Sequence, residues 1–198
     1  MQKTNDQIIQ IRWHGRGGQG AITAAKVVAE AAFRSGYGGV VMAPTFGTER
    51  RGAPVTTSLK ISRNKIYDLS PITTPDIVVV LDHMILHEVD VTSGLRPGGW
   101  IIMNSPRPAE EHAFPGFHTA VANATRLGVE AGLRKGVVNT GIIGALGRAC
   151  GLIGIDMLAE TIAAEFAGRN PEANALAARL VYDATLMHDN TTGDSTDA

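Results

Sequence analysis

The sequence predicts an α/β fold: a single Rossmann-like layered domain with a mostly parallel sheet and a helical C-terminal part. Strand-like apolar segments alternate with helical segments along most of the chain, which is the order that layered α/β folds show. One apolar run, Ile77–Leu81, lies between two aspartates and is typical of a central parallel strand covered on both faces. The length of 198 residues, without an internal repeat or a linker, fits one domain.

The first half of the chain is expected to hold three strands and one long helix. Gly36 stands where a helix C-cap glycine belongs. The third strand alternates only in part, which is typical of an antiparallel strand near an edge. The expected segments are the strands Ile8–Trp13, Gly39–Ala43 and Val55–Ser62, the loops His14–Gly20 and Pro44–Pro54, and the helix Ala21–Ser35 with the apolar face Ile22, Ala25, Ala29, Ala32 and Phe33.

The second half is expected to add three short strands and four helices. The last helix begins with Asn170 as its N-cap and Pro171 at its first position. Residues 189–198 are polar and acidic, so we expect a domain over residues 1–188 and a disordered tail. The expected segments are the strands Ile77–Leu81, Trp100–Asn104 and Phe117–Ala122, and the helices His83–Val91, Thr140–Cys150, Asp156–Ala167 and Glu172–Met187, the last with the apolar face Leu176, Leu180, Val181 and Met187.

Charge and cysteine count exclude several functions. Lys and Arg number 18 and Asp and Glu 19, so the net charge of −1 offers no excess for a nucleic-acid backbone. The one cysteine, Cys150, allows no internal disulfide, no cysteine-based zinc site, and no iron–sulfur cluster held by this chain alone. The N-terminus lacks a signal-peptide pattern and no apolar run is long enough to span a membrane, so we expect a cytoplasmic chain without membrane contact.

The glycine-rich loop His14–Gly20 is the strongest functional signal. Gly15, Gly17 and Gly20 fit the pattern G-x-G-x-x-G between a strand and a helix. Glycines let a backbone approach a phosphate, and a helix N-terminus offers free N–H groups and the positive end of its dipole. A tight strand-to-helix turn is the simpler alternative, but it needs fewer glycines. We therefore expect an anion site.

A dinucleotide is the first ligand to consider for this loop. Its fingerprint includes an acid about 20 residues further on for the ribose. The strand Gly39–Ala43 carries no acid, and the next one is Glu49. A P-loop also fails, because no Gly-Lys-Ser/Thr closes the loop. A third possibility is another phosphorylated ligand, such as coenzyme A. Lys26, Arg16 and the pair Arg50–Arg51 could supply positive charge to it. The alternative for Arg50–Arg51 is a solvated charged loop.

Three motifs occur in order: Gly15–Gly20, Pro44–Val55 (PTFGTERRGAPV) and Asn139–Leu146 (NTGIIGAL). Together they resemble the gamma subunit of the pyruvate or 2-oxoacid:ferredoxin oxidoreductases over roughly residues 8–185. The resemblance implies oxidative decarboxylation of a 2-oxoacid, pyruvate by default, to acyl-coenzyme A and CO₂, with ferredoxin or another acceptor taking the electrons. It also implies partner subunits of alpha, beta and delta type that hold thiamine diphosphate, Mg²⁺ and 4Fe–4S clusters.

The resemblance also assigns residues in this chain. In that family the gamma subunit contributes to coenzyme A binding and assembly. The chain has no Gly-Asp-Gly followed by an Asn-Asn pair, which is the thiamine diphosphate motif, and no cysteine cluster, so the chain alone is expected to be inactive. In the related indolepyruvate small subunits the second motif usually reads Gln-Arg-Gly-Gly, whereas Arg50–Pro54 reads Arg-Arg-Gly-Ala-Pro, which favours the pyruvate type. The residues implied for a coenzyme A phosphate cradle are Gly15, Arg16, Gly17, Gly18, Gln19, Gly20 and Lys26, and those implied for an interface or ligand loop are Glu49, Arg50, Arg51, Gly52 and Asn139.

Other residues have plainer interpretations beside a functional one. His83 and His87 have the i,i+4 spacing of zinc ligands, but no third ligand is evident, so a helix surface is favoured. Asp82 ends a central strand, where ligands often bind, but it also fits a helix N-cap. Cys150 is expected to be a small buried hydrophobe, and Asn139 a helix N-cap unless it meets a ligand or an interface. Two other functions stay open: a stand-alone Rossmann-type nucleotide-binding module, and a homo-oligomeric NAD-dependent enzyme, which the missing ribose acid opposes.

Overall fold

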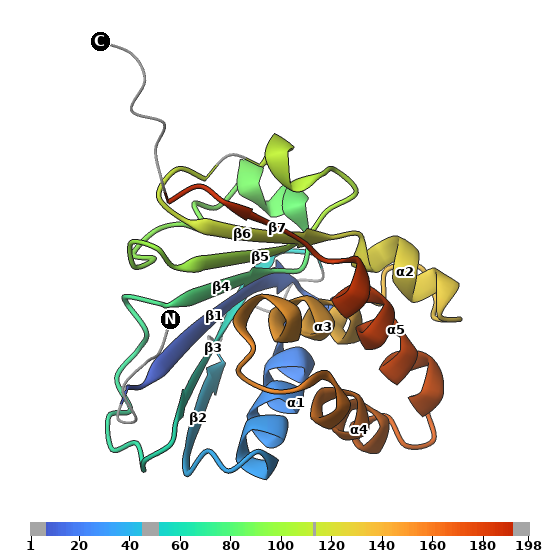
Figure 1. The fold of residues 1–198 in the computed structure, drawn as a ribbon, viewed down its shortest axis with the longest axis horizontal. Helices are drawn as coiled ribbons and strands as arrows, with labels where there is room; N and C mark the ends of the chain where they lie inside the picture. The colour runs from blue at the N-terminus through green and yellow to red at the C-terminus, as the bar shows by residue number, and fades with distance from the viewer. Residues whose placement is uncertain (1–6, 45–51, 113, 192–198) are drawn as a thin grey trace.

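The computed structural model of the protein describes residues 7–44, 52–112 and 114–191, with a single sheet at its centre (Figure 1). The strands are β1 (Ile9–Arg16), β2 (Gly39–Pro44), β3 (Pro54–Ser62), β4 (Ile77–Val80), β5 (Trp100–Asn104), β6 (His118–Ala122) and β7 (Leu186–Asp189). Their order is β2-β3-β1-β4-β5-β6-β7. The central strands β1, β4, β5 and β6 are parallel, whereas β3 is antiparallel to β1 and β2, and β7 to β6. The predicted α/β class is confirmed, and the sheet is mixed with a parallel centre.

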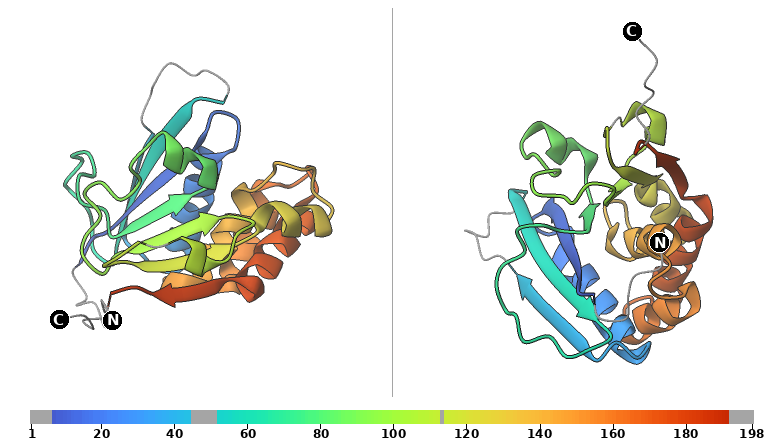
Figure 2. Two further views of the ribbon diagram at one scale, coloured as in Figure 1. Left: turned by 90° about the horizontal axis from the view of Figure 1, so that it is seen from above. Right: turned by 60° about the vertical axis from the view of Figure 1, so that its left-hand side comes forward.

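Helices cover the two faces of the sheet unequally. The helices are α1 (Ala21–Arg34), α2 (Ala124–Glu130), α3 (Asn139–Cys150), α4 (Ile155–Glu165) and α5 (Pro171–Ala184), with two short 3₁₀ helices, η1 (His83–His87) and η2 (Ala109–Glu111). Figures 1 and 2 show α1, α3, α4 and α5 together on one face, where the main core lies. The other face carries η1, η2 and their loops over a smaller apolar cluster. Strand β4 is thus buried on both faces, as its apolar run predicts.

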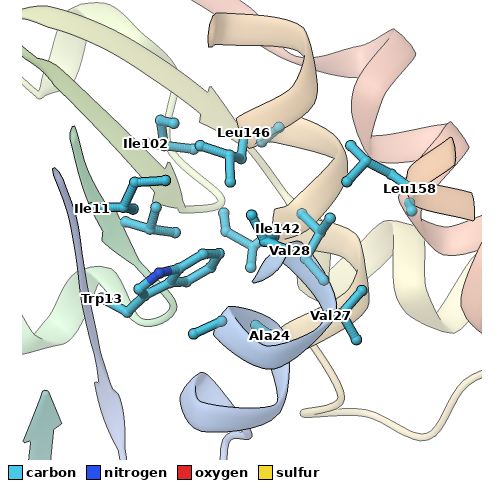
Figure 3. Close-up of a cluster of buried hydrophobic side chains, with 14 of the residues drawn as sticks. Ile11, Trp13, Ala24, Val27, Val28, Ile102, Ile142, Leu146 and Leu158 are labelled. Carbon is cyan, nitrogen blue, oxygen red and sulfur yellow. The ribbon is translucent and has the colours of Figure 1, made fainter. Parts of the chain in front are cut away.

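Trp13 lies at the centre of the main core. Side chains alternate along β1, so Ile9, Ile11 and Trp13 share the face toward the helices. Figure 3 shows the indole of Trp13 beside Ala24 of α1 and Ile142 of α3. All three of these side chains are 1% exposed or less. The strand that leads into the glycine-rich loop is therefore held rigidly.

The buried faces of two helices differ from the prediction. In α1, Ile22 and Phe33 are 42% and 65% exposed, and in α5, Leu176 is 45% exposed. These helices approach their neighbours so closely that small side chains take the inner positions and large ones are left outside. The buried residues are Ala21, Ala24, Ala25, Val27, Val28, Ala31 and Ala32 in α1, and Asn174, Ala177, Ala178 and Val181 in α5.

Several predicted boundaries also change. The last helix ends at Ala184, and Met187 belongs instead to β7, which pairs with β6. Asp189 lies in that strand, so the predicted tail begins too early; residues 192–198 lie outside the described residues. Asn170 is the N-cap of α5 and Pro171 its first residue, as predicted, but Asn170 has a left-handed φ of 55° and its side chain makes no capping hydrogen bond. Helix α2 was not predicted. Within the described ranges, no helix is both long and apolar enough to cross a membrane.

Candidate functional site

The glycine-rich loop lies at the carboxyl end of β1, where the chain turns back into α1. Strand β1 extends to Arg16, so the turn itself is Gly17–Gly20, shorter than the predicted loop. Gly18 and Gly20 have φ values of 92° and 81°, a region that glycine adopts without steric cost. From β1 the chain leads to one side of the sheet and from β4 to the other, so the loop stands at a topological switch point. Ligands of open α/β sheets bind at such points.

Only part of the loop's backbone is available to a ligand. The N–H of Gly17 donates to the carbonyl of Ala53 and that of Gln19 to the carbonyl of Arg16, both at 2.9 Å. The N–H groups of Gly18 and Gly20 have no acceptor among the described residues. The first turn of α1 adds further N–H groups without an intrahelical acceptor, and within the described part of the chain no side chain caps it. These donors and the positive end of the helix dipole can hold an anion.

Asn139 lies directly against this helix N-terminus. The sequence predicts Asn139 as the N-cap of α3. In the structure it is the first residue of the helix, and Val138 takes the cap position. A Cβ atom on Gly20 would lie 2.9 Å from the Asn139 side-chain nitrogen. Asn139 is 8% exposed, and among the described residues its amide has no hydrogen-bond partner. The N-termini of α1 and α3 therefore meet at Asn139, whose side-chain amide is free to bind a ligand.

Arg16 is engaged by two carboxylates. Its Nε donates to Asp82 Oδ2 at 2.9 Å, its Nη2 to Glu88 Oε1 at 2.6 Å, and its Nη1 to the carbonyl of Gly52 at 3.2 Å. The bonds to Glu88 and Asp82 raise the pKa of Arg16, and the bond from Arg16 lowers the pKa of Glu88. Burial by itself would raise the pKa of Asp82, but the N–H of Met84 and the Arg16 guanidinium outweigh it and lower that pKa. Arg16 thus offers no unpaired charge to a phosphate.

Asp82 acts as the N-cap of η1, which was the plainer of its two interpretations. Its Oδ1 accepts the N–H of Met84 at 3.0 Å. Its Oδ2 also accepts from Gln19 Nε2 at 3.4 Å, and Gln19 Oε1 in turn accepts the N–H of Arg16 at 2.7 Å. Asp82 therefore joins the end of β4 to the glycine-rich loop.

Lys26 does not join the loop in the structure. Its ammonium forms an ion pair with Glu165 of α4 at 2.9 Å, and its side chain is 60% exposed. The predicted phosphate contact of Lys26 stays a prediction that this pairing does not support.

The predicted interface loop lies partly outside the described residues. Glu49, Arg50 and Arg51 are among residues 45–51, so their role stays a prediction. The chain directly after them is held against the glycine-rich loop. The N–H of Gly52 donates to the carbonyl of Gly17 at 3.2 Å, and the carbonyl of Ala53 accepts the N–H of Gly17. The second motif of the sequence therefore ends beside the first.

The remaining sequence candidates stay apart from this site. His83 and His87 lie in a 3₁₀ helix with three residues per turn, so this i,i+4 pair does not share a face, and the favoured interpretation of a helix surface fits. Within the described ranges, no group of three or more His, Cys, Asp or Glu side chains could hold a metal ion. Cys150 is half-buried at the end of α3 and packs against the main core.

Comparison with known proteins places this geometry in a family. The family described as pyruvate ferredoxin/flavodoxin oxidoreductase matches residues 10–184. The chain belongs to this family. The pyruvate/ketoisovalerate oxidoreductases common subunit gamma of Thermococcus litoralis is 42% identical over 187 residues, which cover 92% of this chain and 100% of the relative. Within the pyruvate ferredoxin/flavodoxin oxidoreductases, the predicted resemblance to a gamma subunit is thereby confirmed.

Two solved structures share the fold of this chain. The pyruvate oxidoreductase subunit PORC of Thermotoga maritima is 29% identical with a TM-score of 0.79, over 92% of this chain and 99% of that one. A 2-oxoglutarate:ferredoxin oxidoreductase from Magnetococcus marinus, solved with 2-oxoglutarate, coenzyme A and succinyl-CoA, matches with a TM-score of 0.69 and 20% identity. The match covers 92% of this chain but 32% of that longer chain, and it shows the fold alone.

Proposed function

We propose that this gamma subunit holds the phosphates of coenzyme A where the N-termini of α1 and α3 meet, in a thiamine-diphosphate-dependent 2-oxoacid:ferredoxin oxidoreductase. The observation that carries the proposal is Asn139, an 8% exposed amide without a partner among the described residues, against Gly20 at an uncapped helix N-terminus. The amide N–H groups and oxygen of Asn139 are thus free to bond to a ligand at this helix N-terminus. Phosphate oxygens suit both the amide N–H and the helix N-terminus.

Coenzyme A fits this site better than a dinucleotide. Strand β2 (Gly39–Pro44) carries no acid that could hold a ribose hydroxyl. When bound, coenzyme A supplies the thiol that accepts the acyl group. The residues of this chain contribute binding and orientation: Gly18, Gly20 and the first turn of α1 donate N–H groups, and Asn139 donates its amide N–H. The Magnetococcus marinus enzyme, whose chain contains a region of the same fold, was solved with coenzyme A bound.

The other cofactors are assigned to partner chains. The sequence holds one cysteine, whereas a 4Fe–4S cluster takes about four thiolates. We therefore propose that thiamine diphosphate, Mg²⁺ and the clusters lie on alpha, beta and delta-type subunits, and that ferredoxin or another acceptor docks through the complex. The substrate proposed is pyruvate or a branched 2-oxoacid, in line with the relative named for pyruvate and ketoisovalerate. The isolated chain should then show no 2-oxoacid oxidation.

The test compares two glycines with the same backbone constraint. Gly18 and Gly168 have φ values of 92° and 77°, and a Cβ at either meets no atom of the described residues within 4 Å. Alanine therefore strains both positions alike, but only at Gly18 would it meet a bound phosphate. In the assembled enzyme, Gly18→Ala should raise KM for coenzyme A about tenfold or more, the loss of roughly one charge-assisted hydrogen bond. Gly168→Ala should leave KM unchanged; equal effects would contradict the proposal.

A further inference from the structure

The contacts of Arg16 join three segments that are distant in the sequence. Arg16 ends β1, Asp82 follows β4, and Gly52 precedes β3. The guanidinium bonds to Asp82, Glu88 and Gly52 at 2.9, 2.6 and 3.2 Å. The side chains of Arg16 and Asp82 are 22% and 20% exposed, so solvent screens this ion pair less than a surface pair. Each of the three guanidinium nitrogens thus donates to the protein.

Gln19 extends these contacts into the turn that presents the free N–H groups. Its Oε1 accepts the Arg16 N–H at 2.7 Å, and its Nε2 points to Asp82 Oδ2 at 3.4 Å. Gln19 lies between Gly18 and Gly20, the two residues whose N–H groups are unused. Glycines are the most flexible residues of a chain, so the turn needs an external constraint to hold its donors in one arrangement. The Gln19 side chain and the Arg16–Asp82 pair supply that constraint.

The charge of these residues argues against direct anion binding by Arg16. Two carboxylates, Asp82 and Glu88, face one guanidinium, so the group as a whole is negative. A phosphate that approached Arg16 would compete with two acceptors already in place and would be repelled by both. The value of Arg16 to a ligand must therefore be geometric.

We infer that Arg16 and Asp82 are positioning residues that hold the turn Gly17–Gly20 in the conformation that receives the phosphates of coenzyme A. This inference rests on the proposed coenzyme A site. It replaces the expectation from sequence that Arg16 itself binds phosphate.

The two roles of Arg16 predict opposite results for Asp82→Asn in the assembled enzyme. Asn can still cap η1 through its oxygen, but its NH₂ group then faces the donors Arg16 Nε and Gln19 Nε2. If Asp82 positions the turn, KM for coenzyme A rises roughly three- to tenfold, in line with the loss of a part-buried ion pair, while kcat stays within about twofold. If Arg16 binds phosphate, releasing it from Asp82 lowers KM, and that result overturns the inference.

Arg16→Lys gives an independent second test. Lysine keeps the charge but cannot reach three acceptors in a fixed fork. The positioning role predicts a raised KM for coenzyme A, as for Asp82→Asn, and an unchanged KM overturns it. Neither variant should change the exchange of CO₂ with the substrate carboxyl, which does not require coenzyme A. A parallel loss of that exchange would indicate a general structural defect and would also contradict the inference.

The control removes a similar carboxylate elsewhere. Asp156 pairs with Arg179 at 2.8 Å, away from the loop, so Asp156→Asn should leave KM unchanged. Gly18→Ala separates the two proposals. If it raises KM for coenzyme A and Asp82→Asn does not, the positioning role alone is wrong. If Gly18→Ala has no effect, the coenzyme A site itself is wrong.

Discussion

Two buried polar atoms in the core, the indole nitrogen of Trp13 and the hydroxyl of Thr57, have no hydrogen-bond partner among the described residues. The two residues face each other across β1 and β3. An unmet buried hydroxyl costs free energy, and valine has the same shape without it. Thr57→Val should therefore raise the free energy of unfolding by about 1 kcal/mol, measured by urea denaturation.

Thr140 provides a control in which the same substitution should change the free energy of unfolding in the opposite direction. It is also fully buried, but its hydroxyl bonds to Asn174 Oδ1 at 3.2 Å. Thr140→Val leaves that acceptor unmet and should lower the free energy of unfolding by about 1–2 kcal/mol. Destabilisation by both substitutions would contradict this account of Thr57.

His14 makes stability depend on pH. Burial, together with the neighbouring charge of Arg12, lowers the pKa of His14 to about 4, against 6.5 in the unfolded chain. Because the folded pKa is the lower one, the stabilisation is fully present above about pH 6.5 and is lost as pH falls toward 4. From pH 7 to pH 5 the loss should be about 2 kcal/mol. Urea midpoints at the two pH values test this, and His14→Gln should show a smaller loss; an equal loss would assign the effect to other groups.

The residues at the loop show what a sequence can and cannot predict about a site. The glycines and the helix start predict the anion site, because both requirements are local. The partners of Arg16 and Lys26 are not local: Asp82 and Glu165 are 66 and 139 residues away. Their pairing depends on β1 lying beside β4 and on α1 lying beside α4. Counting charged residues in the sequence therefore does not show that the charges of Arg16 and Lys26 are already paired with carboxylates.

At the scale of elements, α3 and α5 pack so closely that the backbone of one helix contacts the backbone of the other. A Cβ atom on Gly144 would lie 2.0 Å from the carbonyl oxygen of Ala178, so no side chain fits there without separating the helices. The glycines and alanines of α3 predict this close packing, because small side chains let two backbones approach. Gly144→Ala should lower the free energy of unfolding by about 2–3 kcal/mol, a cost of overpacking. Thermal unfolding of the subunit measures it.

Gly154 is the matched position for that substitution. It precedes α4 with φ −66°, and a Cβ there meets no atom within 4 Å. Gly154→Ala should cost about 0.5–1 kcal/mol, less than Gly144→Ala, because no clash arises and only the preference of this N-cap position for glycine over alanine is lost. Equal costs at the two positions would contradict the close approach of α3 and α5.

The strands were easier to predict than the inner faces of the helices. The apolar run in β4 and the glycines before β5 define those strands locally. The face of α1 depends on its distance from the sheet, which leaves Ile22 and Phe33 outside and alanines inside. Strand β7 forms only because β6 offers an open edge, and the preceding helical pattern hides it.

For the whole molecule, the sheet order explains how separated motifs form one site. The first motif runs from the end of β1 into the turn, the second ends in the first residues of β3, and the third begins α3, which packs on α1. The order of the motifs along the sequence predicts family membership. The sheet topology is what brings the three motifs together at one site. The proposed division of labour, with coenzyme A on this chain and redox groups on its partners, is thus a property of the assembled enzyme.

Asn139→Asp in the assembled enzyme tests the central claim most directly. Aspartate suits a helix N-terminus, so the fold should be kept, but its charge would repel a phosphate at this position. KM for coenzyme A should rise about a hundredfold or more, while CO₂ exchange is unchanged. Asn123→Asp is the control, since Asn123 caps α2 through its side chain and aspartate caps equally well. An unchanged KM for coenzyme A in Asn139→Asp would show that the phosphates bind elsewhere.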